Sequence, residues 1–141
     1  MTKHNHLAVV ITILAHQAMG FVWYSSFLFG SAWVHGQGKQ MQDLNPAPLP
    51  FVVALIASAA MCYVISWLTR VLKVSSFKGG VGLGTMLWLG LGLPVIAMHY
   101  AFLGISWQVG AIDALYSLAL ASLAGGIIAV WRKPGVAPTT S

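Results

Sequence analysis

Four long apolar runs alternate with short polar connections along the chain. They cover residues 7–29, 51–72, 81–102 and 109–131. Each run reaches the length of about 20 residues that a helix needs to cross the hydrocarbon core of a bilayer. The pattern therefore predicts an all-α protein, a four-helix transmembrane bundle that forms a single membrane domain over residues 1–133. The Gly-, Pro- and Thr-containing residues 134–141 are expected to form a disordered tail.

The composition agrees with a membrane location. Of the 141 residues, 58% are hydrophobic and only 6% are charged, whereas soluble domains carry about 25% charged residues. A chain of this size buries only part of its surface in its own core, so the apolar excess is expected to face lipid. The first run is longer than the apolar region of about 7–15 residues in a secretory signal peptide, so we expect it to be retained as a helix.

The basic residues predict how the bundle is oriented. Lys39 lies on one side of a four-span arrangement, and the other Lys and Arg residues lie on the opposite side. These are Lys3, Arg70, Lys73, Lys78, Arg132 and Lys133. Since cytoplasmic loops carry an excess of Lys and Arg, both termini are expected in the cytoplasm. The net charge of +5 forms no basic patch with interleaved aromatic residues, so nucleic acid is not an expected partner.

Small residues spaced four apart predict where the helices pack against one another. Residues four apart share one helix face, and small side chains allow the close backbone approach on which helix association in lipid depends. In the fourth run these residues are Ser117, Ala121, Gly125 and Ala129. The third run is rich in glycine and contains Pro94, which is expected to kink its helix. Such stripes serve either packing within the chain, or self-association and contact with a larger partner.

Two ionisable residues predict a polar site near one end of the last two runs. His99 precedes the short connection between these runs and Asp113 follows it, so both are expected at a similar depth and facing each other. An Asp–His pair can carry protons, orient a substrate or hold a metal, although a structural hydrogen bond is the commoner case. In the alternative interpretation, Asp113 stabilises the first turn of its own helix, whose free amides favour a carboxylate, and His99 faces elsewhere.

A further histidine, His16, lies near the middle of the first run. Its helix face also carries Thr12 and Gly20, which indicates burial against another helix. His16 is either a neutral residue that donates one interhelical hydrogen bond or a second candidate site for a proton or a ligand. His4 and His6 precede the run and are interpreted as solvated, and their spacing does not predict a metal site.

An aromatic motif follows the first run. Residues 20–25 read Gly-Phe-Val-Trp-Tyr-Ser, and Phe29, Gly30 and Trp33 come after them. This pattern resembles a family of small bacterial membrane proteins of unknown function, whose first helix ends in Gly-x-x-Trp-Tyr-Ser-Pro followed by Phe-Gly-x-x-Trp. The resemblance continues to the end of the fourth run and implies four transmembrane helices and an outer aromatic motif, but no reaction. Ser26 stands here in place of the family's proline, at which a sharp bend is expected.

The aromatic motif has two interpretations of its own. Trp23 and Tyr24 belong either to the belt of aromatic residues at a membrane surface, or to a polar-aromatic binding pocket that they share with His99, Asp113 and Tyr116. The second interpretation makes these five residues the main candidate site.

The sequence leaves three functions open. A non-enzymatic binding or accessory subunit, in the lipid bilayer as a homo-oligomer or within a larger membrane complex, is favoured because no recognised catalytic constellation, cofactor or metal is implied. A small oligomeric transporter or channel is the alternative, since histidine and aspartate lie inside the membrane and Gly and Pro interrupt the third run. A membrane enzyme comes last, because Ser25 has no evident base and the histidines lack zinc-type spacing.

Overall fold

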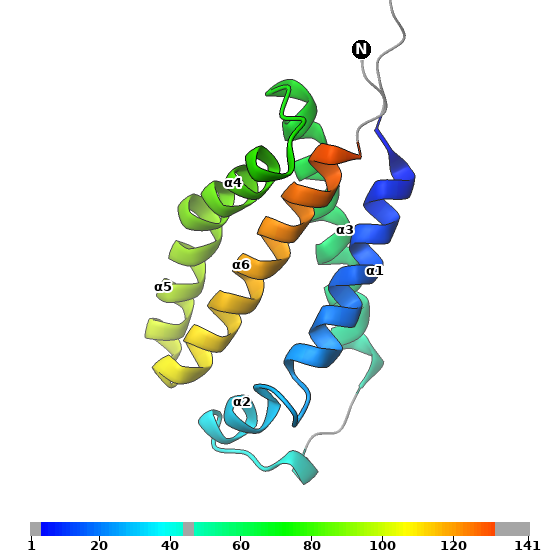
Figure 1. The fold of residues 1–141 in the computed structure, drawn as a ribbon. Coiled ribbons are helices and arrows are strands. Elements are labelled where there is room, and N and C mark those ends of the chain that lie inside the picture. Colours follow the sequence, from blue (N-terminus) through cyan, green and yellow to red (C-terminus); the bar gives the residue numbers. More distant parts are fainter. Residues whose placement is uncertain (1–3, 44–46, 132–141) are drawn as a thin grey trace, which may run out of the picture.

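Four helical units run side by side in this computed structural model, which describes residues 4–43 and 47–131 (Figure 1). They are α1 (His6–Trp23), α3 (Pro48–Val71), a continuous third unit, and α6 (Trp107–Val130). The third unit consists of α4 (Phe77–Leu87), η2 (Trp88–Gly92) and α5 (Leu93–Leu103). A short helix α2 (Gly30–Gly36) and a 3-10 turn η1 (Met41–Asp43) lie between α1 and α3.

All four units are long and apolar enough to cross a membrane. The predicted all-α class is therefore confirmed for the described residues, and so is the presence of four helices long and apolar enough to span a membrane. The predicted tail, together with Lys3, Arg132 and Lys133, lies outside them. A small apolar core joins α1, α3 and α6, with Val9, Cys62 and Ile128 among its members, while most other apolar side chains face outward, as expected for a protein in lipid.

The first helix ends earlier than its apolar run predicts. It stops at Trp23, where the run continues to residue 29. The chain then turns back tightly, because the Gly30 amide donates to the Ser25 carbonyl at 2.9 Å. A Cβ atom on Gly30 would lie 2.2 Å from the Tyr24 carbonyl oxygen, so only glycine fits this turn. The chain thus bends here with Ser26 in place of the family's proline, and the missing side chain of Gly30 makes the bend possible.

The closest helix contact in the bundle is between α4 and α6. A Cβ on Gly80 would lie 2.1 Å from the Gly125 carbonyl oxygen, and one on Gly84 would lie 2.0 Å from that of Ala121. Both distances are far below van der Waals contact, so the two backbones touch without intervening side chains. The small-residue stripe predicted on the fourth run therefore packs against α4 within the chain.

The irregularity predicted at Pro94 takes the form of a π-helical turn. The amide of Leu93 donates to the carbonyl of Trp88, five residues earlier, so the segment η2 is wider than an α-helix. Proline has no amide hydrogen and its ring crowds the preceding turn. A π turn directly before Pro94 accommodates both effects while the helix continues.

The end of the bundle where α1 begins carries a cluster of polar side chains, which we call the His4 cluster: His4, His6, Tyr63, Ser66 and Arg70. Arg70 donates from Nη2 to His4 Nε2 at 2.5 Å, which leaves His4 Nδ1 protonated and donating to Ser66 Oγ at 2.9 Å. His6 Nδ1 and the Tyr63 hydroxyl lie 3.1 Å apart. Partial burial, then Arg70 and His6, lower the pKa of His4. The interpretation of His4 as merely solvated is therefore wrong.

Candidate functional site

The carboxylate of Asp113 is the meeting point of four elements at the opposite end of the bundle. It lies on α6 and accepts hydrogen bonds from the Tyr24 hydroxyl at 2.5 Å, the Trp33 indole at 3.2 Å, and the Tyr100 hydroxyl. These donors come from the end of α1, from α2 and from α5. We call the four residues the Asp113 cage. Burial and the bond to Asp113 raise the pKa of Tyr24, which lies just beyond α1, so its hydroxyl stays a donor.

Asp113 does not cap its own helix. The first helical residue of α6 is Trp107, and the first turn contains no acidic residue. The carboxylate lies one turn further on, and its hydrogen bonds go to side chains of other elements. The alternative in which Asp113 stabilises free backbone amides is therefore wrong in this geometry.

The predicted pair of His99 and Asp113 is not formed. His99 is exposed and forms no hydrogen bond or ion pair with a described residue. Its neighbour Tyr100 occupies the position facing α6 and donates to Asp113 instead. Successive residues of an α-helix point about 100° apart, so placing Tyr100 toward α6 turns His99 away from it.

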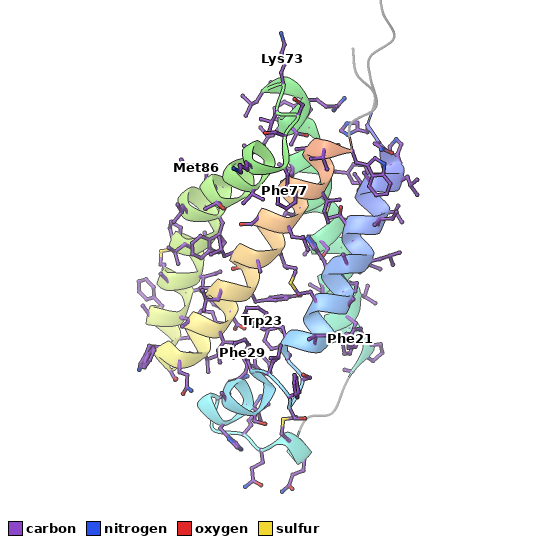
Figure 2. All side chains as sticks on the ribbon, in the orientation of Figure 1. Phe21, Trp23, Phe29, Lys73, Phe77 and Met86 are labelled. Carbon is purple, nitrogen blue, oxygen red and sulfur yellow. The ribbon has the colours of Figure 1, made fainter. Side chains whose placement is uncertain are left out.

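The other predicted site residues lie together. The rings of Tyr24 and Tyr116 have centroids 5.1 Å apart and meet at 72°, and the Trp23 and Tyr116 centroids are 5.9 Å apart. A Cβ on Gly20 would lie 2.8 Å from the Tyr116 hydroxyl oxygen, so this glycine lets the phenol approach the α1 backbone. Trp23 and its neighbour Phe29 lie at this end of the bundle, whereas Lys73 projects from the opposite end (Figure 2). The functional role of these residues stays a prediction.

A pocket of about 420 Å³ opens beside the Asp113 cage, and we call it the aromatic pocket. Its lining includes Gln17, Phe21, Tyr24, Trp33, Phe51 and Tyr116. Five of these are aromatic, and no charged side chain is among the lining residues. Its volume falls within the range of about 300–1,000 Å³ typical of small-molecule sites.

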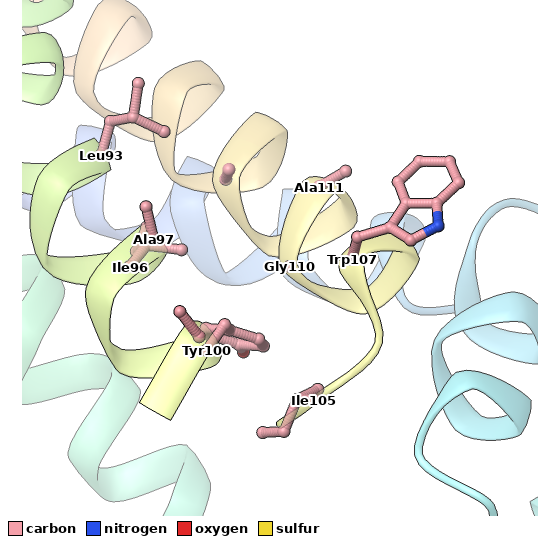
Figure 3. A pocket seen from close by; sticks show the side chains of 10 residues that line it. Leu93, Ile96, Ala97, Tyr100, Ile105, Trp107, Gly110 and Ala111 are labelled. Carbon is pink, nitrogen blue, oxygen red and sulfur yellow. The ribbon is translucent and has the colours of Figure 1, made fainter. Parts of the chain in front are cut away.

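A second hollow lies between α5 and α6, with a volume of about 340 Å³ (Figure 3). Its lining is apolar except for Tyr100, whose ring projects between the two helices. Tyr100 also belongs to the Asp113 cage, so one lining residue of this hollow and one of the aromatic pocket, Tyr24, donate to the same carboxylate.

His16 is fully buried in the middle of α1. Its Nε2 donates to the Leu120 carbonyl of α6 at 3.1 Å, because a carbonyl oxygen can only accept. The predicted interhelical hydrogen bond of His16 is thus present, and its charge state stays a prediction. The remaining nitrogen, Nδ1, is buried and has no partner among the described residues.

Sequence reasoning missed two members of the Asp113 cage, Trp33 and Tyr100. Trp33 belongs to the aromatic motif, but the sequence does not reveal that α2 folds back against α6. Tyr100 adjoins His99 in an apolar helix, and its distance from the short connection matches that of His99 to within one residue. A tyrosine in that position was a detectable signal.

Comparison with known proteins gives a family but no activity. A search of curated proteins and a search of solved structures found no match. A family model described as a protein of unknown function, DUF1761, matches residues 7–129. The match includes all of the Asp113 cage and confirms the resemblance to an uncharacterised family. The chain therefore belongs to DUF1761, a family of proteins of unknown function.

Proposed function

We propose that this protein is a non-enzymatic binding subunit of the membrane, which holds a small amphipathic molecule in the aromatic pocket. The observation that supports this function is the pocket itself, in which five aromatic side chains adjoin an anchored carboxylate. Sites for small molecules are mostly apolar and contain a few fixed polar groups. The side chains of Tyr24 and Trp33 are held by Asp113, so the walls are preorganised.

We also propose the orientation, with both termini in the cytoplasm of a bacterium and the aromatic pocket on the outer side of the inner membrane. Arg70, Lys73 and Lys78 follow one another around the connection from α3 to α4, and Lys39 follows α2 at the pocket end. The excess of basic residues marks the cytoplasmic side. A homo-oligomer or a larger membrane complex is compatible with the apolar surface that most helices present.

A pair of bulky substitutions tests the binding function. Ala54 lines the aromatic pocket, so Ala54→Trp should fill it, whereas Val53→Trp adds the same bulk at an exposed neighbouring position. Mass spectrometry of the purified proteins should find a small molecule with the wild type and with Val53→Trp but not with Ala54→Trp. If the three folded proteins carry the same small molecules in equal amounts, the aromatic pocket is not the binding site.

Proton-coupled transport is a second candidate, and His16 is the observation that favours it. A buried ionisable side chain inside a membrane protein is expensive and is a functional-site hypothesis by default, and His16 Nδ1 lacks a described partner. Proteoliposomes that contain a pH-sensitive dye measure proton flux directly. Flux should depend on His16 and not on the exposed His35, so His16→Gln should abolish it and His35→Gln should not. Equal flux in wild type and His16→Gln refutes this candidate.

A further inference from the structure

The walls that Tyr24 and Trp33 form in the aromatic pocket present ring surface rather than hydrogen-bond donors. The Tyr24 hydroxyl and the Trp33 indole N–H both donate to Asp113, which is not itself a lining residue. The two rings meet at 66°, with centroids 5.2 Å apart, so they form a corner rather than a stack. An aromatic ring is negative on its face and positive at its edge. With the polar hydrogens directed at the carboxylate, the pocket side of these walls favours a positive group.

The charged group directly behind the pocket walls is the carboxylate of Asp113. Asp113 accepts from three neutral donors and has no ion pair with a described Lys, Arg or His. All three partners are donors, so the carboxylate needs no proton of its own to satisfy them. Negative charge is therefore stabilised directly behind Tyr24 and Trp33. An anionic ligand would meet this charge without a cationic partner in the lining, whereas a cation would be attracted by it.

One hydroxyl remains available in the pocket. Tyr116 lines it, and its phenol oxygen lies close to Gly20 but has no hydrogen-bond partner among the described residues. This oxygen lacks a hydrogen-bond partner in the described part of the chain but is not buried, so it reaches accessible space. On the other side, Phe21 and Phe51 stack with centroids 5.9 Å apart and are largely exposed. The pocket thus has a polar-aromatic interior and an apolar rim.

We infer that the aromatic pocket binds the ammonium group of an organic cation, held over the rings of Tyr24, Trp33 and Tyr116 with Asp113 as the counter-charge. Attraction between a cation and a ring is effective within about 6 Å of the ring centroid, and aromatic boxes are the usual receptors for quaternary ammonium groups. The apolar part of the ligand packs on Phe21 and Phe51. This inference specifies the ligand of the proposed binding function and depends on it. The ammonium group belongs either to a lipid headgroup or to a free amine.

A matched pair of probes separates charge from shape. Choline carries a quaternary nitrogen, and its isostere 3,3-dimethylbutan-1-ol has carbon in that position and no charge. Both are titrated into the full chain in an uncharged maltoside detergent, with tryptophan fluorescence and calorimetry as measurements. The wild type should bind choline about tenfold more tightly than the isostere, in line with cation–π attraction supplemented by a nearby charge.

Two variants and a control test the named residues. Asp113→Asn should weaken choline binding toward the level of the isostere, because the rings remain but the counter-charge is lost, and an unchanged choline affinity would exclude Asp113 as the counter-charge. Phe51→Leu should weaken binding of both probes. Phe102→Leu removes a ring that is 87% exposed and lines neither hollow, so it should change nothing. If Asp113→Asn does not fold, the affinities of the wild type and of Phe51→Leu for the two probes still test whether the aromatic pocket binds a cation.

The outcomes distinguish this inference from the function on which it rests. Equal affinity of the wild type for choline and its isostere overturns the cation site while leaving an apolar binding pocket. Failure of the folded wild type to bind either probe overturns the cation site, and it leaves the proposed binding function to the mass-spectrometric comparison of the Ala54 and Val53 variants. Where choline binds, added phosphatidylcholine that competes, beside phosphatidylglycerol that does not, identifies a lipid headgroup as the source. Absence of competition by either lipid identifies a free amine.

Discussion

A single methyl group at Gly84 should destabilise the bundle, because it would separate α4 from α6. The Cβ of alanine at this position would lie 2.0 Å from the Ala121 carbonyl oxygen, whereas ordinary contact begins near 3.4 Å. The backbones must therefore move apart by the difference, 1.4 Å, since the obstacle is backbone and cannot rotate away. Overpacking of this kind costs typically about 1–3 kcal/mol, and we expect Gly84→Ala to lie at the upper end.

The control for this substitution is Gly82→Ala on the same helix. A Cβ on Gly82 meets nothing within 4 Å, so the added methyl group should be neutral or stabilise by up to about 1 kcal/mol. Both variants and the wild type are unfolded reversibly by titrating SDS into mixed micelles, with circular dichroism as the measurement. Equal stability of Gly84→Ala and Gly82→Ala would refute the close backbone contact between α4 and α6.

Three further predictions test packing, topology and pH. Gly125→Leu should lower thermal stability in detergent more than Leu123→Ala, because the leucine side chain at position 125 blocks the backbone contact with α4. Unchanged thermal stability of Gly125→Leu would mean that this face of α6 is exposed to lipid. A cysteine at Gln37 should react with an impermeant thiol reagent added to intact cells and one at Ser75 should not; the reverse pattern would invert the orientation. His4 has a lowered pKa in the folded state, so its contribution to stability is present above the usual histidine pKa of about 6.5 and is lost as the pH falls through the folded value. The stability of His4→Gln should therefore change less than that of wild type between neutral and mildly acidic pH, and identical profiles would contradict this.

The spans were predictable because lipid imposes a length on each apolar run. The ends of α3 and α6 lie within a few residues of the predicted limits. The end of α1 was not predictable in the same way, since the apolar run continues beyond the helix with Phe27, Leu28 and Phe29. The chain leaves the helix there because Gly30 permits a turn that any side chain would block. Such a close approach depends on tertiary geometry, which hydrophobicity does not encode.

The candidate site was predicted in its location but not in its partners. Depth follows from counting residues across a short connection, which placed Asp113 correctly near Tyr24 and Tyr116. Direction requires the rotational phase of each helix. The third unit is apolar on most sides, so its sequence does not show whether His99 or Tyr100 faces α6. Lipid accommodates an apolar helix in either rotation about its axis, and the hydrogen bond of Tyr100 to Asp113 stabilises one of the two.

The side chains through which the third unit contacts α6 grow in size from Gly125 toward the Asp113 cage, and this gradient explains why a hollow lies between α5 and α6. Bare backbone contact at Gly125 and Ala121 gives way one turn later to Ser117, which accepts from the indole of Trp88 at 2.9 Å.

Another turn on, Asp113 is reached by the whole phenol of Tyr100. Side chains of increasing length hold neighbouring helices progressively further apart, since small residues are what allow close approach in lipid. The separation between the third unit and α6 therefore increases from the glycine contact to the Asp113 cage. A change that spreads the glycine contact, such as Gly84→Ala, should also displace Tyr100 from Asp113 and thereby loosen the carboxylate that holds Tyr24 and Trp33 in the walls of the aromatic pocket. Choline affinity in this variant should therefore fall, although the substituted residue lies outside the pocket.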